Sequence, residues 1–233
     1  MLHSLTIMDL AGKHVLITGA SSGIGWELGH ALIRKGAVIS AMDRRPMEKK
    51  VANWTSYDVD ISVSSQIQKA ISQIEEPVDI LINNAGVMRR GKVLESSEED
   101  FDFLFDVNVK GSWLVLKHAL SLLAEDATIV QMSSRHALNL PVDPALYGLT
   151  KRTAMDLADL IAKTYPQYTV KILCPGPVDT PLAHEGVSEA DFAKKKKIMC
   201  TPKEIAERTI ELLESKTKSR LVFDNKNYTY LLE

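Results

Sequence analysis

The sequence predicts an α/β protein whose parallel sheet is covered by helices on both faces. Short apolar runs that are typical of buried strands alternate, along the 233 residues, with segments that carry apolar residues at helical spacing. No internal repeat or low-complexity linker interrupts this alternation, which indicates one domain over residues 1–233. In such a sheet we expect ligands beyond the carboxyl ends of the strands.

Seven segments are predicted to be strands and five to be helices. The strands are His14–Thr18, Val38–Asp43, Thr55–Asp58, Asp79–Asn83, Thr128–Met132, Val170–Cys174 and Arg220–Phe223. The helices are Trp26–Lys35, Ser64–Glu75, Val107–Leu123, Leu146–Tyr165 and Lys203–Glu214. Thr201 and Pro202 are typical of an N-cap and a first helical residue, and Ser62 is a candidate N-cap for the second helix.

Composition and charge exclude several classes of protein. The hydrophobic fraction of 45% and the charged fraction of 25% are typical of globular domains, not of disordered or fibrous chains. A net charge of −2 gives no electrostatic case for nucleic acid or an anionic membrane, and no apolar stretch reaches about 18 residues. Without a signal peptide, a disulfide framework or metal-ligand spacing around Cys174 and Cys200, we expect a cytoplasmic protein without a metal.

A glycine-rich segment, TGASSGIG at residues 18–25, joins the first predicted strand to the first predicted helix. Glycines permit a tight turn there, backbone N–H groups can approach phosphates, and the helix N-terminus adds the positive end of its dipole. The spacing differs from the commonest dinucleotide fingerprint. Asp43 ends the second predicted strand, 18 residues after Gly25, near the spacing of a carboxylate that binds an adenosine ribose.

A second group of residues suits proton transfer. Tyr147 and Lys151 are four apart on a predicted helix and therefore share one face. A tyrosine with a pKa of about 10 is a poor base, but a nearby ammonium favours the phenolate and lowers that pKa. The hydroxyl can then exchange a proton with an alcohol or carbonyl oxygen. Ser134, thirteen positions before Tyr147, can hydrogen-bond the same oxygen.

Taken in order, these motifs resemble the short-chain dehydrogenase/reductase family, from Lys13 to about Leu213. The glycine turn, Asn83-Asn84-Ala85-Gly86, the Asn108 segment, Ser134, Tyr147-x3-Lys151 and the Pro-Gly loop after Cys174 all match. The resemblance implies a doubly wound, mainly parallel, seven-stranded Rossmann-like sheet, usually in a homodimer or homotetramer. It also implies an NAD(P)-dependent oxidoreductase that transfers a hydride between nicotinamide and a small alcohol or carbonyl substrate.

The same resemblance assigns roles to individual residues. The catalytic set is Asn108, Ser134, Tyr147 and Lys151, with Asn108 at a helix bend holding a water of the proton relay. Asp58 and Val59 would bracket the adenine, Val178 and Thr180 would contact the carboxamide, and the polar segment Leu182–Cys200 would be a substrate lid. The cofactor-binding set is Gly19, Ser21, Ser22, Gly23, Ile24, Gly25, Asp43, Arg44, Asp58, Val59, Asn84, Ala85, Gly86, Tyr147, Lys151, Pro175, Gly176, Val178 and Thr180.

The resemblance leaves several points open. Asp43 favours NAD over NADP, although Arg44 beside it weakens that preference. A non-catalytic dinucleotide-binding or sensor protein on the same fold is the alternative function. Arg89, Arg90, Arg135 and His136 follow strand ends and face either an anionic or polyhydroxy substrate or the solvent.

Two regions depart from the family pattern. Only fourteen residues separate Asp43 from Asp58, so the helix that the family has there should be short or absent. The chain after Arg220 lacks the usual glycine-rich ending, which puts tetramer contacts built on that ending in doubt.

Overall fold

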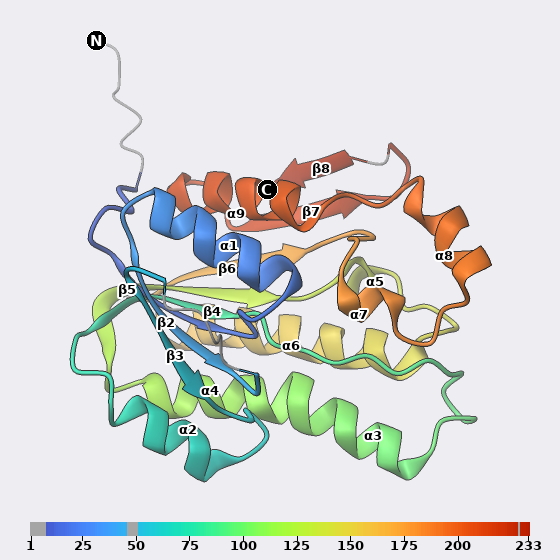
Figure 1. Ribbon diagram of the computed structural model, residues 1–233, viewed down its shortest axis with the longest axis horizontal. Coiled ribbons are helices and arrows are strands. Elements are labelled where there is room, and N and C mark those ends of the chain that lie inside the picture. The colour runs from blue at the N-terminus through green and yellow to red at the C-terminus, as the bar shows by residue number, and fades with distance from the viewer. Residues whose placement is uncertain (1–7, 46–50, 228) are drawn as a thin grey trace.

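The computed structural model describes residues 8–45, 51–227 and 229–233, and these form one sheet with helices on both faces (Figure 1). The strand order is β3-β2-β1-β4-β5-β6-β7-β8. The strands are β1 (His14–Thr18), β2 (Val38–Asp43), β3 (Trp54–Asp58), β4 (Val78–Asn83), β5 (Leu123–Met132), β6 (Thr169–Cys174), β7 (Arg220–Asp224) and β8 (Thr229–Leu232). Strands β1 to β7 pair in parallel, which confirms the doubly wound fold.

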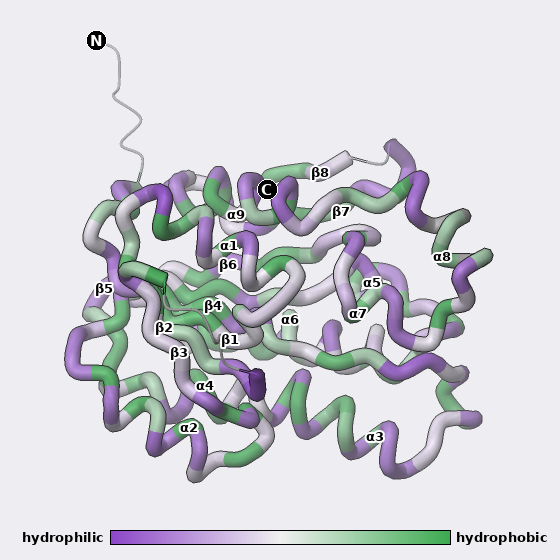
Figure 2. The backbone as a smooth tube through the Cα atoms, in the orientation of Figure 1, coloured by the Kyte–Doolittle hydropathy of each residue, from purple (hydrophilic) through white to green (hydrophobic). Residues whose placement is uncertain are grey.

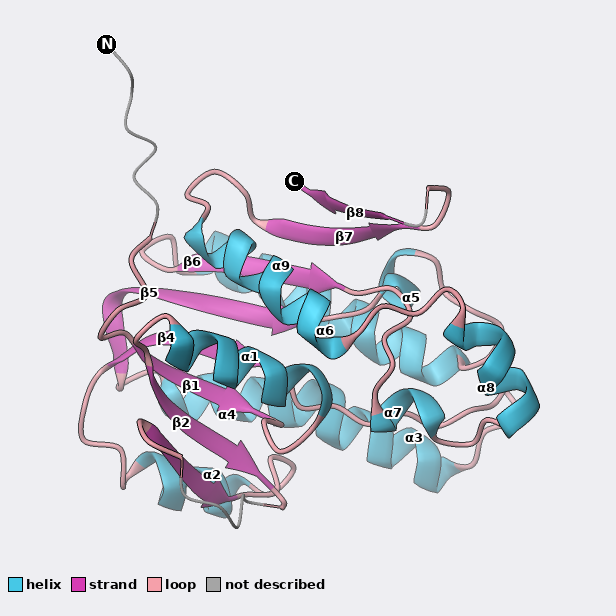
Figure 3. Cartoon of the chain, turned by 45° about the horizontal axis from the view of Figure 1, so that its top comes forward, coloured by secondary structure: helices cyan, strands magenta, loops and turns pink. Residues whose placement is uncertain are grey.

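The expected count of seven strands is wrong, because the described residues include an eighth. β8 pairs antiparallel with β7 and forms a hairpin at the edge of the sheet (Figure 3). Exposed and half-buried residues alternate along β8, so the strand lacks the continuous apolar run that marks a strand buried on both faces. The register sets Tyr230 opposite Phe223 on β7.

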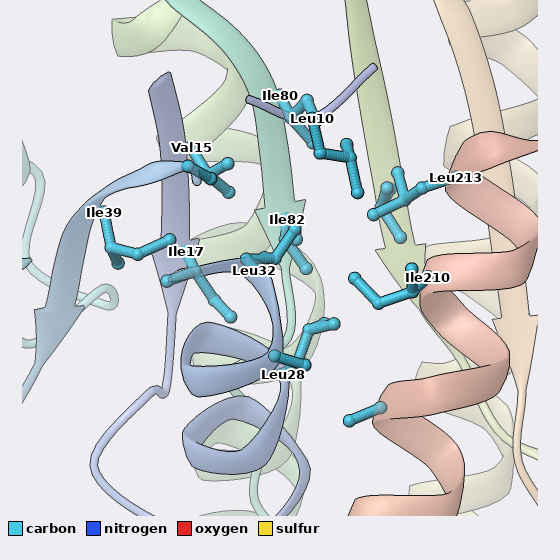
Figure 4. Close-up of a cluster of buried hydrophobic side chains, with 14 of the residues drawn as sticks. Leu10, Val15, Ile17, Leu28, Leu32, Ile39, Ile80, Ile82, Ile210 and Leu213 are labelled. Atoms are coloured by element: carbon cyan, nitrogen blue, oxygen red, sulfur yellow. The ribbon is translucent and has the colours of Figure 1, made fainter. Parts of the chain in front are cut away.

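One face of the sheet is covered by α1 (Gly23–Arg34) and α9 (Pro202–Glu214) (Figure 1). Leu28 and Leu32 of α1 lie in one buried cluster with Ile210 and Leu213 of α9, above apolar side chains of the sheet such as Ile17 (Figure 4). Leu28, Leu32 and Leu213 have no exposed surface, and burying a leucine side chain stabilises a fold by about 1.5–3 kcal/mol.

The opposite face is covered by α2 (Ser64–Ile71), α4 (Ser112–Ala119) and α6 (Ala145–Thr164). A second buried cluster lies there, in which Ile67 of α2 and Val115 of α4 pack with Leu16 and Leu81 of the sheet. Figure 2 shows the hydrophobic residues concentrated on the central strands, with hydrophilic residues on the outer parts of the helices. The strands are thus buried from both sides, as a parallel sheet requires.

The helix predicted at Val107–Leu123 is wrong at both ends. The structure has a continuous helical segment that begins earlier, with α3 (Glu98–Phe105), passes through one π-helical turn (η1, Asp106–Gly111) and ends with α4 at Ala119. Leu123 belongs to β5 instead. Ser97 marks the true start, because its side chain accepts a hydrogen bond of 3.1 Å from the amide of Asp100.

Of the two predicted helix caps, one is confirmed and one is wrong. Thr201 caps α9, and the Glu204 side chain reaches back to the Thr201 amide in a capping box. Ser62 does not cap α2: Val63 holds the N-cap position, and the Ser62 hydroxyl donates to Asp60 at 2.7 Å. The Oδ1 atom of Asp60 accepts from both the amide and the hydroxyl of Ser62, which places Ser62 in a turn before the helix. Helix α2 also ends at Ile71, four residues before the predicted end.

Three further short helices lie near the carboxyl ends of the strands: α5 (Arg135–Leu138), α7 (Pro181–His184) and α8 (Glu189–Lys196) (Figure 3). Segment 182–200, expected to be irregular, therefore contains helical residues. The expectation for the link between Asp43 and Asp58 falls partly on residues 46–50, which lie outside the described residues. Among the described residues, no helix combines the length and apolar character needed to cross a membrane.

Candidate active site

A cavity of about 520 Å³ opens at the carboxyl ends of the strands. Its walls come from the loops that follow β1, β2, β3, β4, β5 and β6, so residues distant in sequence meet at one edge of the sheet. The strand order reverses between β1 and β4, which is the point where ligands bind in doubly wound sheets. The cavity therefore lies at the carboxyl ends of the strands, where the sequence predicts a ligand site.

The glycine turn after β1 forms one end of this cavity. Gly19 has a φ of 68°, and a Cβ on it would lie 2.7 Å from the Cα of Ala85, so a side chain fits neither the backbone conformation nor the space. Helix α1 begins at Gly23, three residues before the predicted start, and Ser22 at its N-cap makes no side-chain capping bond. Amides of the first helical turn consequently remain for an anion in the cavity.

Asp43 at the end of β2 is held rigidly. One carboxylate oxygen accepts from the amide of Ser21 in the glycine turn and the other from the amide of Arg45, each at 3.0 Å. Arg44 lines the cavity beside it and lies 3.9 Å from a carboxylate oxygen of Asp60. The carboxylate is thus fixed at the cavity wall, and the neighbouring guanidinium already has an acidic partner.

Two residues of the expected cofactor-binding set lie off the cavity surface. Asp58 is exposed at the end of β3, and Asp60 and Ile61 line the cavity in its place, beside Val59. Residues two apart in an extended backbone point to the same side. The sequence alone therefore could not tell whether Asp58 or Asp60 lines the cavity. Gly25 lies inside the turn, where a Cβ would approach the carbonyl oxygen of Gly19. The other seventeen members of that set line the cavity.

The segment after β4 is tied to the segment after β1. The Asn84 side chain donates to the carbonyl oxygens of Thr18 and Gly19 at 2.9 and 2.8 Å. In return, the Thr18 hydroxyl accepts from the amides of Asn84 and Ala85. These bonds hold the two loops at a fixed separation on either side of the switch point.

Ser134, Tyr147 and Lys151 meet at the other end of the cavity. All three are buried yet line it, with 8%, 8% and 3% of their surface exposed. Tyr147 and Lys151 are one turn apart on α6, and Ser134 follows β5. The Lys151 Nζ atom donates to the carbonyl oxygen of Met132 at 3.3 Å. The structure thus brings together three of the four residues in the expected catalytic set.

The protonation of this pair differs from the expectation. Burial raises the pKa of Tyr147 to about 12, although the neighbouring Ser134 hydroxyl opposes the shift. Burial likewise lowers the pKa of Lys151 to about 8. Removal of water from around each group disfavours its charged form, and in the protein without ligand this effect exceeds the stabilisation of a phenolate by the ammonium. At neutral pH the phenol therefore keeps its proton.

Asn108 lies behind the cavity wall, in the π-helical turn η1. Its amide group pairs with the backbone of Val87 at both ends: the oxygen accepts from the amide at 2.8 Å, and the nitrogen donates to the carbonyl at 2.9 Å. The same nitrogen donates to Thr150 of α6 at 3.0 Å. Asn108 thereby fixes the loop after β4 against the helix that carries Tyr147 and Lys151, which gives a reason for a polar residue buried within a helix.

The loop after β6 closes the remaining side of the cavity, with Pro175, Gly176, Pro177, Val178 and Thr180 in its lining. The Thr180 side chain caps α7, which starts the segment 182–200. The far end of this segment returns to the same loop, because the amide of Cys200 donates to Pro177 and its carbonyl accepts from Asp179. Both cysteines are free thiols.

Three of the four basic residues that follow strand ends face the cavity, and one does not. Arg90, Arg135 and His136 line the cavity, whereas Arg89 lies over the ring of Phe103 at 4.4 Å and pairs with Asp100 and Glu185. Sequence reasoning missed several apolar lining residues, which lie at or after strand ends or within segment 182–200: Met88, Met132, Ile198 and Met199. No motif marks them, since any residue of similar size serves as an apolar wall. The described residues hold no group of three or more potential metal ligands.

The fold and the site define an α/β protein that binds a nucleotide at the switch point of its sheet. The family model for the short chain dehydrogenase matches residues 13–191, and the chain belongs to this family of oxidoreductases.

Relatives of known name agree with this assignment. Oxidoreductase UcpA of Salmonella typhimurium is 37% identical over 191 residues, which cover 75% of this chain and 72% of the relative. Among solved structures, aldohexose dehydrogenase of Thermoplasma acidophilum aligns with a TM-score of 0.80 at 25% identity over 90% of this chain and 89% of that one. The 3-ketoacyl-(acyl-carrier-protein) reductase of Brucella melitensis, complexed with NADH, aligns with a TM-score of 0.79 at 25% identity over 91% and 96%.

Proposed function

We propose that this chain is a nicotinamide-dinucleotide-dependent oxidoreductase that interconverts a secondary alcohol and a ketone in a small molecule. The observation that carries the proposal is the convergence of Ser134, Tyr147 and Lys151 on one wall of a cavity whose far end is the glycine turn and Asp43. Such a cavity holds a dinucleotide along its length and a substrate at the tyrosine end. The NADH named for the Brucella melitensis structure supports the same class of cofactor.

The residues present fit a dinucleotide. The glycine turn and the first turn of α1 would hold the pyrophosphate, because backbone amides and the helix dipole favour a negative charge there. Asp43 would bind the hydroxyls of the adenosine ribose, with Val59 beside the adenine. Pro175, Gly176, Val178 and Thr180 would form the wall beside the nicotinamide. A Cβ on Gly86 would lie 2.9 Å from Lys151 Nζ, so a side chain there would displace the lysine head from its present position.

The protein's own part in the reaction is to orient the substrate and move a proton. Bound nicotinamide supplies the hydride chemistry. The Tyr147 phenol, protonated at neutral pH, is in the form that donates to a carbonyl oxygen during reduction. The Ser134 hydroxyl, near that phenol, donates to the same oxygen as negative charge develops on it. Lys151, with Nζ 5.9 Å from the centroid of the Tyr147 ring, stabilises the phenolate left behind.

We also propose that NAD is preferred over NADP. A 2′-phosphate would stand where Asp43 accepts the ribose hydroxyls, and two negative charges within a few ångströms repel each other. Asp43 cannot turn away easily, because two backbone amides hold its carboxylate. Arg44, which could attract the phosphate, lies near Asp60. Segment 182–200 is proposed as the substrate lid, since it starts and ends on the loop that lines the cavity.

The experiment that tests the function is a panel of secondary alcohols, sugars and keto compounds, followed by nicotinamide absorbance with wild type and Tyr147→Phe. The variant removes the exchangeable proton and keeps the ring, so we expect turnover to fall by about 10²–10⁴-fold while NAD still binds. Tyr165→Phe, an exposed tyrosine at the end of the same helix, is the control and should turn over normally. Normal turnover by Tyr147→Phe contradicts the proposed mechanism, and NAD binding without turnover of any substrate favours the sensor alternative.

A further inference from the structure

The hairpin of β7 and β8, where the chain departs from the family ending, packs against the loop after β6. The Tyr230 ring of β8 lies edge-on to Phe223 of β7, with 5.2 Å between centroids, and the guanidinium of Arg208 on α9 lies 5.3 Å from the Tyr230 centroid. These contacts direct the Tyr230 hydroxyl to Gly176, whose amide donates to it at 3.0 Å. Gly176 is one of the residues that line the cavity.

Phe223 restrains Gly176 from a second direction. A Cβ on Gly176 would lie 2.5–2.7 Å from three carbons of the Phe223 ring, so the ring packs directly on the glycine backbone. The hairpin therefore contacts the loop both through an aromatic face and through a hydrogen bond to its amide.

The Tyr230 hydroxyl also reaches the end of segment 182–200. It lies 3.3 Å from the Cys200 sulfur, and that sulfur lies 3.3 Å from the carbonyl oxygen of Pro177. The Gly176 amide can only donate and the Pro177 carbonyl can only accept, so one arrangement satisfies every group. Gly176 N–H donates to Tyr230, Tyr230 O–H donates to Cys200, and Cys200 S–H donates to Pro177.

This circuit begins and ends on adjacent residues of the cavity wall. Burial raises the pKa of the Tyr230 phenol and of the Cys200 thiol, so both keep the hydrogens that the circuit requires. Without the Tyr230 hydroxyl, the partly buried Gly176 amide would have lost its acceptor. The free-energy cost of that loss favours the state in which all three hydrogen bonds are formed.

We propose that Tyr230 is a positioning residue: its hydroxyl, acting with Cys200, holds the loop 175–178 in the shape that binds the nicotinamide side of the cofactor. The proposal rests on the proposed function for the identity of the ligand. The hydrogen-bond circuit itself is a property of the protein without ligand. Segment 182–200 is tied to the same wall, since Cys200 at its end contacts both Pro177 and the Tyr230 hydroxyl.

The first measurement uses the full chain without cofactor. We compare the rate at which N-ethylmaleimide alkylates Cys200 in wild type, Tyr230→Phe and Tyr165→Phe, by mass spectrometry. The fully buried Cys174 serves as the internal reference. Loss of the Tyr230 hydroxyl should raise the Cys200 rate by about five- to tenfold, the factor expected for one hydrogen bond, with no change in Tyr165→Phe. An unchanged Cys200 rate in Tyr230→Phe overturns the circuit, whether or not the protein binds NAD.

The second measurement titrates NAD into the same variants and into Cys200→Ala and Cys200→Ser. We expect Tyr230→Phe and Cys200→Ala to weaken NAD binding by about five- to tenfold, and Cys200→Ser, which restores a donor and an acceptor, to recover most of the affinity. Faster alkylation together with unchanged NAD affinity overturns the positioning role. Failure of wild type to bind either NAD or NADP overturns the proposed function instead, and the alkylation measurement still judges the circuit.

Discussion

The Lys151 ammonium lies 5.9 Å from the centroid of the Tyr147 ring, one helical turn along α6, and both groups are buried. Burial moves their two pKa values apart, to about 12 for the phenol and about 8 for the ammonium. Burial of Lys151 therefore destabilises the folded protein at neutral pH, because the charged ammonium is held away from water.

Replacing Lys151 by methionine should stabilise the protein at neutral pH. The folded pKa of about 8 lies below the usual 10.5, so the folded state binds fewer protons than the unfolded chain between these two values. Wild-type stability thus rises as pH increases through this window, and the full penalty acts below about pH 8. We expect Lys151→Met to be more stable at pH 7 by up to about 3 kcal/mol, an advantage that shrinks towards pH 10.5. Urea unfolding measures it.

The control for this prediction is Lys163→Met, an exposed lysine on the same helix. The stability of that variant should track wild type across the whole pH range. A Lys151→Met protein that is less stable than wild type at pH 7 would show that the bond to Met132 outweighs the burial of the charge.

Asp43 should set the cofactor preference. We expect wild type to bind NAD more tightly than NADP, and Asp43→Ala to lose or reverse the preference. Hydrogen bonds to a carboxylate contribute about 1.5–3 kcal/mol, so NAD affinity should fall by about ten- to hundredfold. Calorimetric titration of both cofactors into wild type, Asp43→Ala and Arg44→Ala measures this. Tighter binding of NADP than of NAD to wild type would show that Arg44 governs the site.

Segment 182–200 should exchange amide hydrogens faster than α6 in the free protein, and more slowly with cofactor and substrate bound. An exposed pair of Arg89 and Glu185, 3.4 Å apart, joins this segment to the loop after β4. Since exposed ion pairs contribute about 0.2–1 kcal/mol, Glu185→Gln should speed exchange of the segment by up to about fivefold. Glu95→Gln, which removes a similar exposed pair with Lys92, is the control. Equal exchange in the free and ternary states would contradict a lid.

Thr201 should contribute measurably to stability through α9. Thr201→Ala removes the capping box, which costs about 0.5–2 kcal/mol, whereas Thr201→Ser keeps the acceptor for the Glu204 amide and should unfold near the wild-type midpoint. Because α9 packs against α1, the loss should appear in the global unfolding midpoint. Equal midpoints for Thr201→Ala and Thr201→Ser would show that the cap contributes nothing.

The sequence predicted the bounds of an element correctly where the residues of that element alone were diagnostic. The bounds of β1 and β2 match the prediction, because each is an apolar run buried from both sides and closed by turn residues. Thr201 was found as a cap because threonine followed by proline marks a helix start. By contrast, the sequence did not predict α3: the helix has eight residues, of which only Leu104 is buried, and Phe101, Leu104 and Phe105 form a single i, i+3, i+4 set, too short a repeat to mark a helix.

The sequence by itself determined the doubly wound fold, the glycine turn and the grouping of Ser134, Tyr147 and Lys151, because each depends on residue types at fixed spacing along one or two elements. Only the tertiary structure decided that Asp60, not Asp58, lines the cavity, that burial outweighs the ammonium at Tyr147, and that Tyr230 holds Gly176. Desolvation and hydrogen bonds between segments depend on which groups meet in space. No spacing along the chain encodes the meeting of Tyr230 with a loop 54 residues before it.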